Sequence, residues 1–368
     1  MQLVYLSPVP WASFAQRPHS FVKWFHEASC GEVLWLDPYP TRLPSWKDLR
    51  KLGNKQRGGE QDVPQWLRVI VPRCLPIEPV PASGLINKLF WKHTLREIAL
   101  FSRDAPTVIG IGKPSELALQ LLSRVNAPIS FYDAMDDFPA FYSGLSRAAM
   151  TRREIMLVER VMHLFVSSTA LLHRWQSVKG DVKLIHNGLA VDVLPNVVPY
   201  KGVRLKKVLG YVGTIGEWFD WDWLIALARN RPDNVVRLIG PVFSPPVRQL
   251  PSNIGILPPC NHASALEAMS NFDVGLIPFK QNQLTAAVDP IKYYEYRALG
   301  LPVVSTRFGE MALRGKEIGT YLSNGIDDVI APIEAALTYR FDEHEVRGFR
   351  ITNSWEARFA ATGIIASV

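Results

Sequence analysis

The stretch of sequence with the clearest chemical potential joins a lysine and a glutamate at the start of one predicted helix. Residues 289–305 read DPIKYYEYRALGLPVVS. Pro290 suits a first helical turn and Gly300 a helix end, and the apolar residues that follow predict a buried strand. The first turn of such a helix has free N–H groups, which together with Lys292 favour a phosphate. Glu295, one turn later, offers two acceptor oxygens to a diol such as ribose.

A simpler interpretation of this stretch is an amphipathic helix with a surface ion pair. Lys292 and Glu295 have the i, i+3 spacing at which opposite charges meet on a helix. From these residues alone, the surface pair is the favoured interpretation. The choice between a phosphate-binding helix and a surface ion pair therefore depends on the elements around the stretch and on the rest of the chain.

The chain alternates short apolar runs with helical-period stretches in two successive series, a pattern typical of parallel α/β sheets. Two doubly wound domains facing a cleft are predicted, at 1–200 and 201–350, followed by a helical tail at 351–368. Ligands of such sheets bind at the carboxyl ends of the strands. The first domain has predicted strands at 3–6, 33–36, 67–71, 107–111, 129–132, 164–167 and 182–185. The second has them at 208–212, 235–239, 254–257, 274–278, 302–305 and 320–322.

The composition is that of a folded globular protein. Hydrophobic residues make up 48% of the 368 residues, charged residues make up 20%, and the mean hydropathy is +0.03. No apolar run reaches the roughly 18–20 residues of a spanning helix, and the amino terminus does not resemble a signal peptide. The three cysteines are far apart and form no CxxC pair, which disfavours a disulfide framework or a cysteine zinc site. A cytoplasmic location is therefore expected.

Four motifs, taken in order, resemble glycosyltransferases of the GT-B fold. Residues 289–305 resemble the nucleotide-sugar motif, in which Pro, Lys and Glu precede A-x-G-x-P-V-V. Residues 211–215, YVGTI, resemble the first strand and glycine loop of the donor domain, and Asn187-Gly188 resembles the N-G-x-x that closes the first domain. Residues 16–19, QRPH, resemble a motif of a bacterial subgroup that includes teichuronic-acid-type enzymes and, more distantly, the xanthan glucuronosyltransferase. The resemblance covers nearly the whole chain.

The resemblance implies a transferase that moves a sugar from a nucleotide diphosphate sugar, UDP-linked, to a saccharide or a lipid-diphosphate-linked saccharide. The donor would bind the second domain and the acceptor the first, and the final helix would cross back onto the first domain. Polysaccharide biosynthesis is the implied context. The fold generally works without a catalytic metal, because a helix dipole and basic residues stabilise the leaving diphosphate. No cofactor and no metal site are expected.

The resemblance also assigns donor residues. Glu295 would bind the ribose hydroxyls and Lys292 the diphosphate, at a helix start that includes Pro290 and Ile291. A glycine turn would form the other side of the donor site. There, Gly213 and Thr214 would line the diphosphate or the sugar, because a glycine permits close backbone approach.

One departure from the family pattern bears on stereochemistry. Retaining enzymes of this fold usually carry Glu-x7-Glu, whereas Ala287 stands eight positions before Glu295. This favours inversion, which needs a general base to deprotonate the acceptor hydroxyl. Asp136 and Asp137, after the strand at 129–132, are the candidates, and one of them would serve. The alternative is that they cap the following helix. Asp133 is expected to be structural, tied to backbone at the strand end.

Acceptor contacts are predicted at the first β–α turn. Trp11, Arg17 and His19 could hold a phosphate or a sugar there, or they could simply begin a helix with a surface arginine. His186 is more typical of a satisfied loop histidine than of a base. The eight histidines form no HExxH pair, in keeping with a site without metal.

Two other functional classes compete with a transferase. A nucleotide-sugar 2-epimerase of the same fold would need no acceptor. A non-enzymatic protein could bind anionic membranes or nucleic acid through its net charge of +7. Nucleic-acid binding is disfavoured because the sequence has no RNA-binding aromatic signature and no zinc finger. A dehydrogenase is disfavoured because no G-x-G-x-x-G follows the first strand.

A basic segment at 42–103 suggests a peripheral association with the inner membrane face. It holds twelve lysines and arginines against five acidic residues. Leu85 and Leu89, with Lys88 and Lys92, predict a helix that has both an apolar and a basic face. The alternative is that this helix packs into the core and its lysines merely face water.

Overall fold

The computed structural model describes residues 1–41, 63–125, 127–195 and 205–367. It contains two compact units, one formed by Met1–Ile185 with Phe359–Val368 and the other by His186–Arg358. The predicted division at residue 200 and the predicted tail at 351–368 differ from these limits. Residues after 185 bond within the second unit, because Leu189 exchanges backbone hydrogen bonds with Asn353 and Trp355.

The first unit is built on a seven-stranded parallel sheet of order β3-β2-β1-β4-β5-β6-β7. Its strands are β1 (Gln2–Leu6), β2 (Glu32–Leu36), β3 (Leu67–Ile70), β4 (Thr107–Ile111), β5 (Ile129–Ala134), β6 (His163–Val166) and β7 (Val182–Leu184). The order reverses between β1 and β4, and ligands of doubly wound sheets bind outside the carboxyl ends at such a point. The strands at the centre of the sheet are buried along their whole length, which explains their continuous apolar runs.

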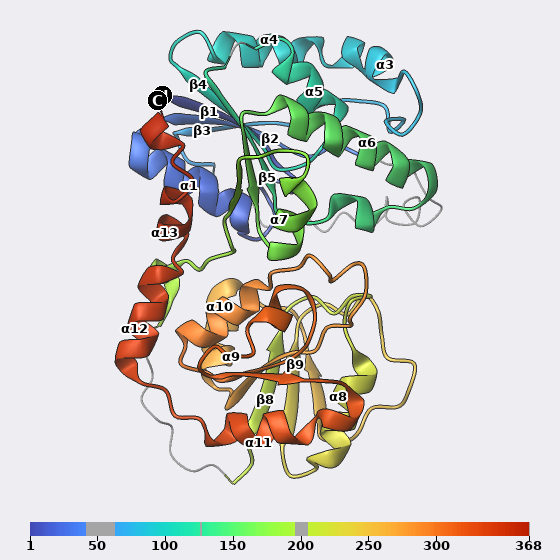
Figure 1. The fold of residues 1–368 in the computed structure, drawn as a ribbon, viewed down its shortest axis with the longest axis vertical. Helices are drawn as coiled ribbons and strands as arrows, with labels where there is room; N and C mark the ends of the chain where they lie inside the picture. Colours follow the sequence, from blue (N-terminus) through green and yellow to red (C-terminus); the bar gives the residue numbers. More distant parts are fainter. Residues whose placement is uncertain (42–62, 126, 196–204, 368) are drawn as a thin grey trace. The chain divides into compact units, whose positions relative to one another are not determined.

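Helices cover both sides of this sheet. They are α1 (Arg17–Ser29), α3 (Ser83–Phe90), α4 (Lys92–Phe101), α5 (Glu116–Leu122), α6 (Gly144–Arg160) and α7 (Thr169–Gln176), with a short 3-10 helix η1 (Phe138–Phe141) before α6. Figure 1 shows α1 on one side of the sheet and α3, α4 and α5 on the other. The single helix predicted from Leu85, Leu89, Lys88 and Lys92 is divided between α3 and α4, which break at the fully buried Trp91.

The second unit has a six-stranded parallel sheet of order β10-β9-β8-β11-β12-β13, which reverses between β8 and β11. Its strands are β8 (Val208–Val212), β9 (Val235–Ile239), β10 (Ile254–Leu257), β11 (Val274–Ile277), β12 (Val303–Thr306) and β13 (Thr320–Ser323). Its helices are α8 (Trp221–Asn230), α9 (His262–Ser270), α10 (Ile291–Ala298), α11 (Ile330–Thr338), α12 (Glu343–Thr352) and the start of α13 (Trp355–Ala360).

The end of the chain returns to the first unit. Phe359 is buried with its ring 5.0 Å from that of Phe21 and 5.7 Å from that of Trp24, both on α1. Lys183 donates to the carbonyl of Thr362 at 2.9 Å. Within the described ranges, no helix is long and apolar enough to cross a membrane.

Candidate functional site

The loop after β5 is fixed to the first unit by a buried ion pair. Arg17, the first residue of α1, donates from Nε and Nη2 to the two carboxylate oxygens of Asp133, both at 2.8 Å. Its Nη1 donates to the carbonyl of Ile185, also at 2.8 Å. Both side chains are almost fully buried. This pairing favours the structural role expected for Asp133, although the partner of its carboxylate is Arg17 and not the backbone.

A second ionic network holds the next part of the loop. Arg174 of α7 donates to Asp137 at 2.7 Å and to Glu154 of α6 at 2.8 Å. Glu154 is fully buried and also accepts from the Tyr132 hydroxyl at 2.9 Å. Burial raises the pKa of Glu154 to about 7, although Arg174 opposes the shift. Asp137 thus helps to position the loop, and its side chain makes no capping bond to η1.

Asp136 lies between these two networks and belongs to neither. Its backbone carbonyl accepts from the N–H of Phe138, but within the described part of the chain no hydrogen bond or ion pair engages its carboxylate. The side chain is partly exposed to solvent. The surrounding protein atoms and the charges of Asp133 and Asp137 raise its pKa to about 7, against the opposing effect of Arg17. A carboxylate with such a pKa is suited to act as a general base near neutral pH.

The three predicted acceptor residues have different environments. Arg17 is 3% exposed and its guanidinium is committed to Asp133, which favours a structural role. His19 is 6% exposed and stacks near Trp11 and Trp35, and burial lowers its pKa, so it is neutral at pH 7. Trp11 alone of the three keeps a partly exposed side chain. Its backbone N–H donates to Asp37, which holds this turn to the end of β2.

In the second unit, a glycine turn follows β8 at the reversal point of the sheet. Gly213 has φ +151°, a conformation that favours glycine, and its N–H donates to Ile239 at 2.9 Å. A Cβ on Gly240, after β9, would lie 2.1 Å from the carbonyl oxygen of Gly213, so the two turns pack backbone to backbone. Gly213 and Thr214 remain partly exposed.

Helix α10 is bonded to the residue that precedes this turn. Val212, just before Gly213, donates its N–H to the hydroxyl of Tyr296 at 3.1 Å. Tyr296 directly follows Glu295 in α10, so the glycine turn and the helix are neighbours. Pro290 is the residue before the helix, and Ile291 and Lys292 form its first turn.

Glu295 is held between two cationic or polar partners. Lys292 Nζ lies 2.5 Å from Oε2, and His262 Nε2 lies 2.9 Å from Oε1. Glu295 is 6% exposed, and this burial opposes ionisation, but Lys292 and His262 outweigh it and lower its pKa. The predicted i, i+3 pair is therefore present, yet it is more buried than a surface pair. His262, the first residue of α9, was not predicted from the sequence.

Asp289 anchors the start of this helix. It accepts from the backbone N–H of Asn187 at 2.7 Å, from the hydroxyl of Tyr294 at 2.9 Å and from Arg314 at 2.8 Å. The amide of Asn187 donates in return to the carbonyl of Asp289 at 2.7 Å. His186 lies 3.7 Å from Asp289 and 3.7 Å from Glu310. This histidine is a satisfied loop residue, as the sequence suggested.

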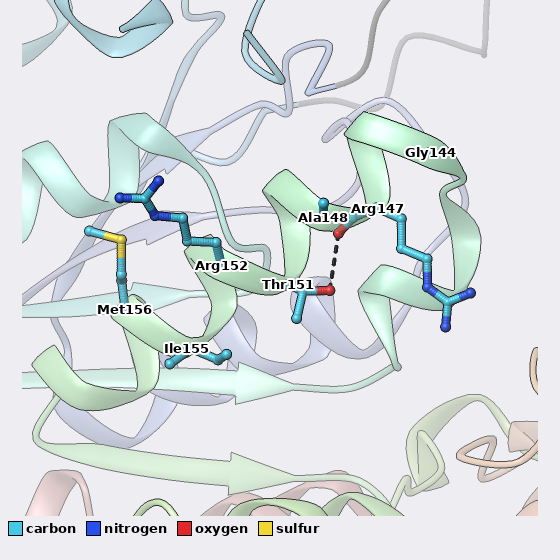
Figure 2. Close-up of a pocket in the computed structure, with 7 residues that line it drawn as sticks. All are labelled: Gly144, Arg147, Ala148, Thr151, Arg152, Ile155 and Met156. Atoms are coloured by element: carbon cyan, nitrogen blue, oxygen red, sulfur yellow. Dashed lines mark hydrogen bonds between the residues drawn. The ribbon is translucent and has the colours of Figure 1, made fainter. Parts of the chain in front are cut away.

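An open groove along α6 in the first unit does not coincide with any of these residues. Figure 2 shows side chains three and four residues apart on one face of the helix: Gly144, Arg147, Ala148, Thr151, Arg152, Ile155 and Met156. The hydrogen bond among them runs from the Thr151 hydroxyl to the helix carbonyl of Arg147 at 3.0 Å. The groove lacks converging polar groups, so we do not assign it as the site. Over the described ranges, no three His, Cys, Asp or Glu side chains are placed to hold a metal ion.

Comparisons with known proteins bear on the resemblance. No profile of a known protein family matches the chain. A Bacillus subtilis (strain 168) protein, provisionally named the teichuronic acid biosynthesis glycosyltransferase TuaH, is 26% identical over 260 residues. The matched region covers 62% of this chain and 64% of that protein, which is less than two thirds of its length.

Solved structures match over the whole chain. A sucrose-phosphate synthase from Thermosynechococcus elongatus has a TM-score of 0.71 at 15% identity, covering 99% of this chain and 98% of that one. An E. coli structure described as trehalose-6-phosphate bound with UDP-2-fluoro glucose has a TM-score of 0.64 at 12% identity, covering 100% and 99%. The predicted fold of two Rossmann-like domains is confirmed, as is the resemblance to teichuronic-acid-type glycosyltransferases: the chain has the GT-B fold.

Proposed function

We propose that the chain is a glycosyltransferase that moves a sugar from a UDP-linked sugar to a saccharide acceptor with inversion at the anomeric carbon. The second unit would hold the donor and the first unit would supply the base. The observation that carries the proposal is the environment of Glu295, a buried carboxylate that Lys292 and His262 keep ionised in the second turn of α10. The name of the Bacillus relative and the UDP-2-fluoro glucose of the E. coli structure support a sugar nucleotide as donor.

The donor side of the proposal follows from charge. Glu295 would accept hydrogen bonds from the ribose hydroxyls, which requires its ionised form. Lys292 and the first N–H groups of α10 would stabilise the diphosphate as it leaves with the electrons of the broken bond to the anomeric carbon. Gly213, which lacks a side chain, would let the diphosphate approach the backbone. In this scheme the residues of the chain supply the positive charge, and no cofactor or metal is required.

The acceptor side rests on Asp136. Its carboxylate would take the proton of the acceptor hydroxyl while the hydroxyl oxygen bonds to the anomeric carbon. A pKa of about 7 makes it a stronger base than an ordinary aspartate, and it is still largely ionised slightly above neutral pH. Trp11 is the remaining candidate for a contact to the sugar. The name of the Bacillus relative, which refers to teichuronic acid biosynthesis, favours a saccharide as acceptor. We propose that a lipid diphosphate carries this saccharide.

Nucleotide binding and product stereochemistry together test this proposal. Calorimetry with UDP, GDP, CDP and ADP should show preferential binding of UDP, which weakens in Glu295→Ala but not in Glu267→Ala, an exposed glutamate on α9. Proton NMR of the first product formed from an α-linked donor should show a β-linkage. An α-linkage rejects inversion and Asp136 as base. Sugar or UDP released at the same rate without any acceptor would indicate an epimerase-type reaction instead.

A further inference from the structure

Helix α3 has its polar and apolar faces reversed relative to a helix that packs on a core. Its buried residues are Ser83 and Asn87. Four large apolar side chains of the same helix face solvent, and their exposed fractions are 70% for Leu85, 47% for Ile86, 64% for Leu89 and 46% for Phe90. Single exposed apolar residues are common, but four on two turns form a patch that marks an interaction surface.

Specific hydrogen bonds hold α3 in this orientation. Asn87 accepts from the N–H of Leu75 at 2.9 Å and donates to its carbonyl at 3.1 Å. The Ser83 hydroxyl donates to the carbonyl of Glu78 at 2.8 Å. Rotating the helix to bury its leucines would break these bonds and leave buried polar groups unpaired. The sequence-based alternative, in which this helix packs into the core, is therefore wrong.

The exposed charges in the chain segment that contains the patch, residues 71–103, are basic. Between residues 71 and 103 the exposed charged side chains are those of Arg73, Lys88, Lys92, Arg96 and Arg103. Within the described part of the chain, none of the five has an ion-pair partner. The two acidic residues of this stretch are engaged elsewhere: Glu78 is buried beside Arg153, and Glu97 pairs with Arg68. The rest of the predicted basic segment, residues 42–62 with Trp46, lies outside the described residues.

We propose that α3 and the start of α4 dock the protein on an anionic lipid bilayer. The four apolar side chains would enter the interfacial region, and Lys88, Lys92 and Arg96 would contact lipid phosphates. A protein partner would need a complementary acidic surface, whereas an anionic bilayer combines an apolar interior with dense negative charge. Figure 1 shows α3 and α4 along the outer edge of the first unit. The proposal uses no donor or base residue, so it goes beyond the proposed function and can fail independently of it.

Co-sedimentation with vesicles tests the docking surface. The full chain should bind phosphatidylglycerol–phosphatidylcholine vesicles and not pure phosphatidylcholine vesicles. Replacing both Lys88 and Lys92 by Gln should weaken binding about thirtyfold, from about 1 kcal/mol for each basic residue. Replacing both Leu85 and Leu89 by Gln should weaken it about tenfold or more. Raising the salt from about 0.1 M to about 1 M should remove most of the binding, because the Debye length falls to about 3 Å.

A matched control separates this surface from general charge and hydrophobicity. Leu313 and Lys316 are exposed in the second unit. A control variant in which both are replaced by Gln should bind vesicles like the parent protein. Thermal unfolding of all variants should stay close to the parent, since none of the replaced side chains is buried. The proposal is overturned by equal binding to neutral and anionic vesicles, by no binding, or by binding that the α3 variants leave unchanged. A lipid-free dimer that Leu85→Gln/Leu89→Gln dissociates would also overturn it, by assigning the face to self-association.

Discussion

Two carboxylates, one in each unit, have opposite electrostatic environments. Asp136 in the first unit has no bonded cation among the described residues, and its pKa is raised to about 7. Glu295 in the second unit is less exposed to solvent, yet Lys292 and His262 lower its pKa. Burial alone would raise the pKa of both. The partners of each carboxylate, rather than its depth, therefore decide which one is poised to take a proton and which one stays ionised.

This difference assigns different tasks to similar groups. A carboxylate whose pKa lies near 7 can exchange a proton during a reaction, whereas a permanently ionised one can only bind and orient. The cations near Asp136 are already engaged: Arg17 by Asp133 and Arg174 by Asp137 and Glu154. The loop is thus positioned by its neighbours while Asp136 remains available. Substitutions in the two units should therefore separate proton transfer in the first from donor binding in the second.

The largest effect is expected from removing the base. Asp136→Asn should lower kcat about 10²–10⁴-fold with the affinity for UDP unchanged, because the amide cannot accept the proton. Asp137→Asn should cost much less, since Asp137 is held by Arg174 and only positions the loop. Asp104→Asn, an exposed aspartate of the same unit, is the matched control and should have parent activity. Steady-state kinetics and calorimetry on the three variants decide between these roles, and an active Asp136→Asn would end the base assignment.

The next largest effect concerns the pair that supports the loop. Asp133→Asn leaves the guanidinium of Arg17 buried without its counter-charge and should lower the free energy of unfolding by about 3–5 kcal/mol. Glu334→Gln breaks the more exposed pair that Glu334 forms with Arg231, and it should change the free energy of unfolding by less than about 1 kcal/mol. Urea denaturation measures both. Equal, small losses would mean that the buried pair does not stabilise the first unit.

A smaller effect is expected on the donor side. Glu295→Ala and Lys292→Ala should each cost about 1.5–3 kcal/mol, or roughly tenfold to a hundredfold in donor affinity or rate, because each loses a charge-assisted hydrogen bond. His262→Ala should cost less, because that side chain is half exposed. Titration calorimetry with UDP checks all three. Parent-like affinity in both Glu295→Ala and Lys292→Ala would remove the donor assignment from α10.

Most of the fold could be predicted from local sequence patterns. The strands β4, β8, β9 and β10 have the predicted limits, because a buried parallel strand is a continuous apolar run bounded by turn residues. The break at Trp91 was missed because the apolar pattern continues through it. No apolar periodicity marks the start of α6 at Gly144, because the six residues before the buried Met150 are partly or fully exposed.

The site could be predicted only where its residues are close in sequence. Lys292 and Glu295 were found together because one helical turn joins them. The pairing of Arg17 with Asp133 spans 116 residues, and that of His262 with Glu295 spans 33, so no local pattern reveals either. His262 could have been suspected only from its place shortly after the predicted strand at 254–257, because ligands of parallel sheets bind at the carboxyl ends of strands. The choice between Asp136 and Asp137 could not be made from the sequence, because it depends on Arg174 of α7, which pairs with Asp137 and not with Asp136.

The pH dependence of transfer tests the central claim most directly, because it reports the ionisation of the base in the working enzyme. With a raised pKa, Asp136 is protonated and inactive below neutral pH and becomes competent as the pH rises through about 7. We expect kcat/KM measured between about pH 5 and 9 to rise tenfold per unit on the acid side and to level off above a pKa of about 7. The residual activity of Asp136→Asn should lack this rise on the acid side, which is the acid limb of the pH profile. A parent profile that is flat down to about pH 5, or an unchanged limb in Asp136→Asn, would contradict the assignment of Asp136 as the general base.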